Sequence, residues 1–132
     1  TIFNLLMSQI ESISHGEGYA NEPTTQQWMT ICQLDKILPN TGVCALVNSK
    51  QVAVFRVGEG TDVYAIDNYD PFSKAYVLSR GIVGDKTGIP KVASPIYKQN
   101  FSLLTGECLD DPTVKLSTFI VRVIDGQVQV SS

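Results

Sequence analysis

Histidine and cysteine, the side chains that most often bind soft metals, are scarce in this sequence of 132 residues. The one histidine is His15, and the three cysteines, Cys32, Cys44 and Cys108, show no C-x-x-C spacing. They match none of the short metal-binding motifs, and we interpret them as buried thiols of a reducing cytoplasm. A lone histidine also leaves no oriented base for Ser-His-Asp or Cys-His chemistry. We therefore predict no catalytic residues.

Basic residues and long apolar runs are also few. Ten Lys and Arg stand against 13 Asp and Glu, which gives a formal net charge of -3. No basic run is present to attract a phosphate backbone or an anionic membrane. No apolar stretch approaches the roughly 18 residues of a spanning helix, and no signal peptide is visible. We predict a cytoplasmic protein that binds neither nucleic acid nor membranes.

What the sequence does contain is typical of one folded domain preceded by a short extension. Residues 1–13 place apolar side chains at helical spacings, and residues 15–27 have a polar linker composition, so we divide the chain into 1–27 and a β domain over 28–132. The helix-like segment has three open interpretations. It packs on its own domain, docks on another chain, or precedes a true start at Met7.

Short runs rich in Val, Ile, Tyr and Phe dominate the rest of the chain and are separated by turn residues. We expect strands near 28–32, 42–48, 51–57, 62–67, 81–84, 91–94, 99–104, 116–124 and 127–130, and one helical turn near 34–39. Asp125-Gly126 predicts a tight hairpin between the last two strands. Gly58-Glu59-Gly60 lies between strands and not before a helix, so we interpret it as a hairpin loop and not as a phosphate-binding site. The fold class is all-β, an antiparallel sandwich or small barrel.

Two segments point to a more specific architecture. One is Asp70-Pro71-Phe72 with Arg80-Gly81 beyond it, and the other is Ser94-Pro95-Ile96-Tyr97 with Thr105-Gly106 beyond it. Together they resemble the two loops of a Rieske domain, which hold a [2Fe-2S] cluster through C-x-H and C-x-x-H. The resemblance implies an ISP-type antiparallel fold.

The four ligand positions of that pattern are filled by Asp70, Phe72, Ser94 and Tyr97. Phe72 has no lone pair, and the two hydroxyls are neutral and bind iron weakly. We therefore predict that the chain binds no metal and no cofactor. Two readings of these residues remain open. They fill the space of a lost cluster, or they belong to a docking surface with aromatic and arginine side chains, for which the candidates are Phe72, Tyr76, Arg80 and Tyr97.

The chain from Trp28 to about Val130 resembles one family of Rieske-like proteins without ligands, the small subunit of the cytoplasmic NAD(P)H-dependent assimilatory nitrite reductase. The segments that carry the resemblance are 41–46, 52–56, 70–72, 77–81 and 92–95. The resemblance implies a large subunit that binds FAD, siroheme and an iron–sulfur cluster and reduces nitrite to ammonium. Other functions stay open, because a fold does not prescribe one: a Rieske-like electron carrier with unrecognised ligands, or an independent interaction module.

Overall fold

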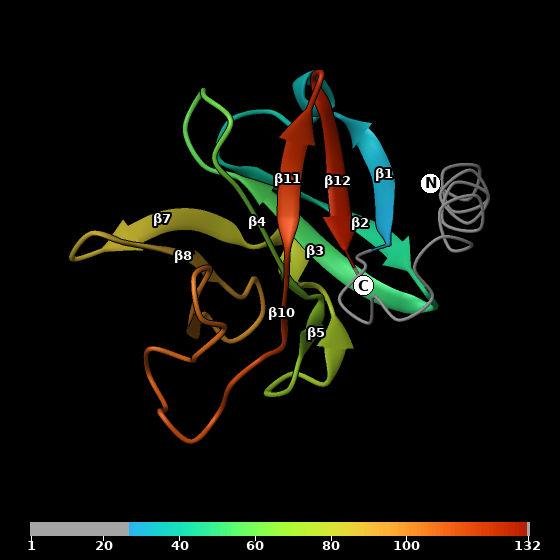
Figure 1. The fold of residues 1–132 in the computed structure, drawn as a ribbon. Coiled ribbons are helices and arrows are strands. Elements are labelled where there is room, and N and C mark those ends of the chain that lie inside the picture. Colours follow the sequence, from blue (N-terminus) through green and yellow to red (C-terminus); the bar gives the residue numbers. More distant parts are fainter. Residues whose placement is uncertain (1–26, 132) are drawn as a thin grey trace, which may run out of the picture.

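The structure is a computed structural model, and it describes residues 27–131. Nearly all regular structure in this part is β-strand, with two short 3-10 helices (Figure 1). In chain order the elements are β1 (Trp28–Gln33), η1 (Leu34–Lys36), β2 (Thr41–Val47), β3 (Lys50–Arg56), β4 (Val63–Asp67), β5 (Tyr69–Asp70), β6 (Ala75–Tyr76), η2 (Leu78–Arg80), β7 (Ile82–Lys86), β8 (Ile89–Ala93), β9 (Asn100–Ser102), β10 (Thr118–Phe119), β11 (Val121–Ile124) and β12 (Gln127–Ser131). The predicted all-β class is confirmed.

The strands form three antiparallel sheets and one small hairpin. The terminal sheet has the order β1-β12-β11, the central sheet β10-β4-β3-β2 and the lateral sheet β7-β8-β9, while β5 and β6 pair only with each other. The lateral sheet projects from the side of the molecule, and the β5–β6 hairpin lies at the end away from the β11–β12 turn (Figure 1).

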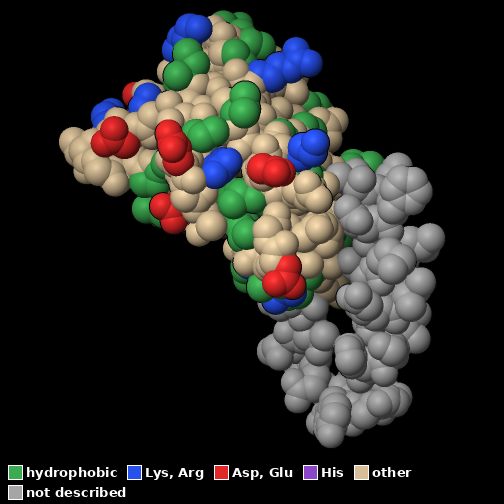
Figure 2. Space-filling view, turned by 90° about the horizontal axis from the view of Figure 1, so that it is seen from above, with side chains coloured by type: hydrophobic (Ala, Val, Ile, Leu, Met, Phe, Trp, Pro, Cys, Tyr) green, Lys and Arg blue, Asp and Glu red, His purple; other side chains and the backbone are tan. Residues whose placement is uncertain are grey.

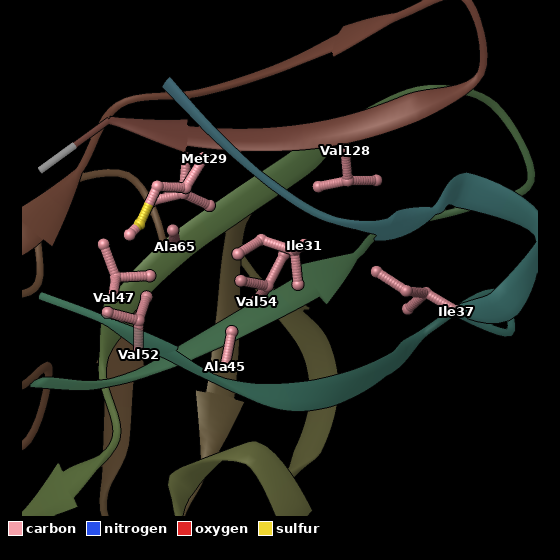
Figure 3. Packing of buried hydrophobic residues seen from close by; sticks show 10 residues of the cluster. Met29, Ile31, Ile37, Ala45, Val47, Val52, Val54, Ala65 and Val128 are labelled. Carbon is pink, nitrogen blue, oxygen red and sulfur yellow. The ribbon is translucent and has the colours of Figure 1, made fainter. Parts of the chain in front are cut away.

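The central sheet has a core on each of its two faces, which explains the apolar run of β3. Val52 and Val54 face the terminal sheet, where Met29 and Val128 meet them (Figure 3). The alternate residues Ala53 and Phe55 face the second core, which includes Val92 and Phe101 of the lateral sheet. Successive side chains of a strand point to opposite faces, so four consecutive residues, 52–55, are all buried.

The predicted strands match the observed ones closely, with three differences. The predicted strand 116–124 is two strands, β10 and β11, separated by the exposed Ile120. The short β5–β6 hairpin and the helix η2 were not predicted. The helical turn after β1 is present as η1, and the loop 58–60 joins β3 to β4 as expected. The predicted tight turn at Asp125-Gly126 is confirmed, because both residues have positive φ (51° and 75°), as a type I′ turn requires.

The interpretation of all three cysteines as buried thiols was wrong in part. Cys108 is buried, Cys32 is half-buried and Cys44 is exposed, and all three are free thiols. In β2 the buried residues are Ala45 and Val47, so strand alternation turns Cys44 toward solvent.

The predicted helix-like segment and linker lie outside the described residues, apart from Gln27. Within residues 27–131 no helix has both the length and the apolar character that a membrane crossing requires. Figure 2 shows the end of the molecule opposite the β5–β6 hairpin, where side chains of both charges are interspersed with hydrophobic ones.

Candidate functional site

Two five-residue loops form the candidate site, and each begins with a buried polar residue followed by proline. The first loop, residues 70–74, connects β5 to β6, and the second loop, residues 94–98, follows β8. Asp70 and Ser94 open the two loops, and both side chains are buried. These loops are the two segments that the sequence singled out.

Asp70 is the common hydrogen-bond acceptor of the site. Its Oδ2 accepts from Ser94 Oγ of the second loop at 2.5 Å and from Ser73 Oγ at 2.8 Å. Its Oδ1 accepts from the backbone N–H of Phe72 at 2.9 Å. One buried carboxylate therefore connects the two loops and also fixes the turn of its own loop.

Burial and hydrogen bonding act in opposite directions on the pKa of Asp70. Burial raises the pKa, since it penalises the charged form. The hydrogen bonds from Ser94, Ser73 and the backbone of Phe72 favour the carboxylate, and together they hold the pKa of Asp70 below its ordinary value. Asp70 is therefore ionised at neutral pH, and a buried ionised carboxylate needs these donors to be stable.

The two loops have the same backbone design. In the first, Lys74 N donates to Asp70 O at 2.7 Å, and in the second, Lys98 N donates to Ser94 O at 3.1 Å. Ser94 Oγ accepts from the backbone N–H of Ile96 at 3.3 Å. Asp70 Oδ1 accepts in the same way from the backbone N–H of Phe72, also two residues later. Short polar side chains that bond the backbone two residues later are typical of turns.

Asn68 anchors the first loop to the body of the domain, and sequence reasoning missed it. Its side chain is buried, accepts from Ser79 N at 2.7 Å, and donates to Gln51 Oε1 at 3.1 Å. Its backbone carbonyl accepts from Leu78 N at 3.1 Å. The only sequence signal was an asparagine directly after an apolar strand, which is common in plain turns.

The four predicted interface residues are not equivalent in the structure. Phe72 is half-buried and packs on the second core, with its ring centroid 6.1 Å from that of Phe101. Tyr97 of the second loop is 59% exposed. Tyr76 is also exposed, and its ring contacts that of Tyr69 in a tilted arrangement, with centroids 4.9 Å apart, beside a groove next to the β2–β3 turn. Arg80 is exposed and makes no ion pair within residues 27–131.

The residues at the four positions of the Rieske pattern do not fit a [2Fe-2S] cluster. Phe72 offers no donor atom, and Ser94 already donates its hydroxyl proton to Asp70. Nowhere between residues 27 and 131 do three His, Cys, Asp or Glu side chains lie where they could hold one metal ion. Cys32 and Cys108 belong to different core clusters. The hydrogen bond between Asp70 and Ser94 makes the connection between the loops.

An antiparallel β domain with two such loops facing each other is the arrangement of a Rieske domain. The fold and the loops thus define the chain as a Rieske-like β domain whose loop residues do not suit a cluster. In agreement, the family model of the Rieske-like [2Fe-2S] domain matches residues 27–131.

Similar proteins place the chain more narrowly. It is 48% identical to the nitrite reductase (NADH) small subunit of Salmonella typhimurium over 104 residues, which are 79% of this chain and 96% of that one. It is 45% identical to the Escherichia coli protein NirD, whose NMR structure superposes with a TM-score of 0.77. The superposition covers 82% of this chain and 98% of NirD. The chain belongs to the Rieske-like family and, within it, to the small subunits of nitrite reductase (NADH).

A third relative carries the same domain inside a longer chain. The nitrite reductase [NAD(P)H] large subunit of Klebsiella oxytoca is 41% identical over 108 residues, which are 82% of this chain and 11% of that one. The same kind of domain therefore occurs both as a separate small subunit and as part of a protein named as a large subunit.

Proposed function

We propose that this chain is the small accessory subunit of an NAD(P)H-dependent nitrite reductase in the cytoplasm. It supports the reduction of nitrite to ammonium by a large subunit and carries no electrons itself. The observation that carries the proposal is the 48% identity over 96% of a protein named as such a small subunit. The loop residues agree with a non-redox role, since Asp70 and Ser94 bond to each other.

The large subunit is the partner. The Klebsiella oxytoca relative supports this, because a domain that is fused to an enzyme in one organism is expected to work in contact with that enzyme in others. In this proposal the large subunit holds the FAD, the siroheme and the iron–sulfur cluster, and this chain holds none of them. Residues 1–27 form a segment ahead of the Rieske-like domain 28–132.

The docking surface in this proposal includes the tips of the two loops. In this proposal the predicted residues have different roles: Asp70 and Ser94 are buried and hydrogen-bonded to each other, while Tyr97 is exposed. Phe72 has both a packing role and a docking role in this proposal. Its ring packs on Phe101, and the side chain is only half-buried, so part of it can meet a partner. Exposed aromatic side chains are common anchors of protein interfaces.

Co-expression of the large subunit with and without this chain tests the proposal. We expect nitrite-dependent oxidation of NAD(P)H to rise several-fold when the chain is present, and the two proteins to co-purify. Equal activity and no complex would remove the proposal. Iron content of the isolated chain separates this function from that of an electron carrier.

The variants Tyr97→Ala and Phe72→Ala separate docking from packing. We expect Tyr97→Ala to weaken assembly without changing the melting temperature, because the side chain is largely exposed. Phe72→Ala should weaken assembly and also lower the melting temperature, because it removes a contact with the second core. Leu38→Ala is the control, since Leu38 is 66% exposed near η1, in another part of the chain. It should change neither quantity.

A further inference from the structure

The two loops end in the same way, with a lysine in the left-handed region of backbone space. Lys74 has φ 59° and Lys98 has φ 68°. The sequences of the loops are Asp-Pro-Phe-Ser-Lys and Ser-Pro-Ile-Tyr-Lys. Each lysine donates its backbone N–H to the carbonyl of the first residue of its loop, at 2.7 Å and 3.1 Å. The two lysines are therefore structurally equivalent.

The backbone alone does not explain a lysine at either position. Positive φ is strained for a residue with a Cβ, and glycine adopts it freely. When other residues adopt it, Asn and Asp are enriched; Asn40, Asn48 and Asp125 follow that rule, whereas Ser49, Thr87 and the two lysines do not. Lysine is not enriched there, although the Lys98 ammonium group also donates to a carbonyl of its own loop. A strained residue that occurs twice at equivalent loop ends suggests a use for its side chain.

The environment of the two ammonium groups agrees with such a use. Both lysines are exposed. Lys98 Nζ donates to Pro95 O at 3.3 Å, and neither ammonium group meets a carboxylate within residues 27–131. The carboxylate of Asp70 is buried and already accepts hydrogen bonds from both loops. The two positive charges thus remain available at the ends of the loops.

Exposed apolar side chains lie in the same loop as one of these charges. Ile96 is 46% exposed and Tyr97 is 59% exposed, and both precede Lys98 in the second loop. A free anion would neutralise the lysines but would leave these apolar groups in water. A protein surface with an apolar hollow and carboxylates at its rim would cover both.

We propose that Lys74 and Lys98, at the equivalent ends of the two loops, are two cationic contacts that select an acidic rim on the partner of the loop tips. This inference rests on the proposed function, in which that partner is the large subunit. The whole chain has a formal net charge of -3, so its overall charge opposes binding to an acidic surface. Screening limits charge effects to about 8 Å at physiological salt, so the two lysines act locally and favour the orientation that brings acidic groups to the loop ends.

The test is the affinity of the full chain for the large subunit at low and at high salt. The variant K74G/K98G removes both charges and also relieves the backbone strain. We expect it to melt at the same or a higher temperature, yet to bind about ten-fold more weakly at low salt. K74E/K98E should bind more weakly still. Both differences should shrink toward 0.5 M salt, at which the screening length is ~4 Å.

Two control variants match the two changes. K36E/K86E alters the net charge by the same amount as K74E/K98E, at exposed lysines of η1 and of the β7–β8 hairpin, and it should reduce affinity much less. Thr87→Gly relieves a positive φ of 50° in the β7–β8 turn, and it should leave affinity unchanged.

The outcomes separate this inference from the proposed function. If the wild-type chain binds the large subunit and both double variants at 74 and 98 bind equally well, the inference is wrong and the function stands. If the wild-type chain does not bind at any salt concentration, the function fails and the inference fails with it. Saturable binding of pyrophosphate to the chain alone, lost in K74G/K98G, would assign the lysines to a small anion and overturn the inference.

Discussion

Asp70 is the residue on which the geometry of the two loops depends most. Its carboxylate accepts hydrogen bonds from Ser73 and Phe72 in its own loop and from Ser94 in the other. In a cluster-bearing Rieske domain, metal ligation links the two loops. Here a charged hydrogen bond does so, and such bonds are stronger than neutral ones.

Removal of the Ser94 hydroxyl tests that link. Ser94→Ala deprives a buried carboxylate of one donor, and we expect it to lower the free energy of unfolding by about 1.5–3 kcal/mol. Ser73→Ala is the matched control, because Ser73 donates to the same oxygen but lies half-buried within the first loop. We expect it to cost about 1 kcal/mol. Urea denaturation measures both, and equal costs would argue against a link between the loops.

The lowered pKa of Asp70 predicts how stability depends on pH. The folded pKa lies below the unfolded value of about 3.9, so the stabilisation is fully present above that value. It is lost as the pH falls through the folded pKa. Asp110 and Asp111 also have lowered pKa values, through hydrogen bonds from Asn100 and from Thr113.

A comparison with Asp70→Asn therefore isolates the contribution of Asp70. At pH 7 we expect the wild type to be more stable, and below about pH 4 the two unfolding free energies should converge. Denaturant titrations between pH 7 and pH 2 measure the difference. A gap that stays constant to pH 2 would show that the charge of Asp70 does not stabilise the fold.

At the scale of elements, two glycines allow close packing of segments that follow the two loops. A Cβ on Gly106 would lie 2.1 Å from Leu116 O, and its φ is +83°. A Cβ on Gly81, which follows η2, would lie 2.3 Å from Ala93 O of β8. Gly81 thus lets the segment after the first loop approach the strand before the second loop, and Gly106 lets its own turn approach Leu116.

Two glycine variants separate backbone strain from close packing. In Gly58→Ala the added Cβ would have nothing within 4 Å, so only the positive φ lowers the stability of this variant. We expect it to lose about 1 kcal/mol. Gly106→Ala adds a contact with a backbone carbonyl and should lose about 3 kcal/mol or more. Thermal unfolding of both variants tests this, and equal losses would contradict the packing role of Gly106.

The sequence predicted the elements well where local pattern and tertiary structure agree. The apolar run of β3 and the Asp125-Gly126 turn follow from alternation and turn chemistry alone. The break at Ile120 and the outward side of Cys44 depend on which sheet covers which face, and a single strand pattern does not contain that information. The motif spacing singled out the two loops. The roles of Asn68 and of the pair Asp70 and Ser94 required side-chain contacts between distant segments.

At the scale of the whole molecule, the chain has a Rieske-like fold, and the residues at the usual ligand positions do not suit a cluster. The base of the two loops, at Asp70 and Ser94, is buried, and Tyr97 in the second loop is exposed. This arrangement suits a rigid docking element, because the hydrogen bonds of the base hold the tips in one geometry. In the proposed function, this is how a domain of this class serves an enzyme whose redox groups belong to the partner.

The measurement that tests this account most directly is the iron and acid-labile sulfide content of the isolated chain. The chain should be purified without oxygen from iron-replete cells, and its visible absorbance should be recorded before and after dithionite. The account predicts no stoichiometric iron or sulfide and no absorbance that dithionite bleaches. Two iron and two sulfide per chain, with a reducible visible spectrum, would contradict it.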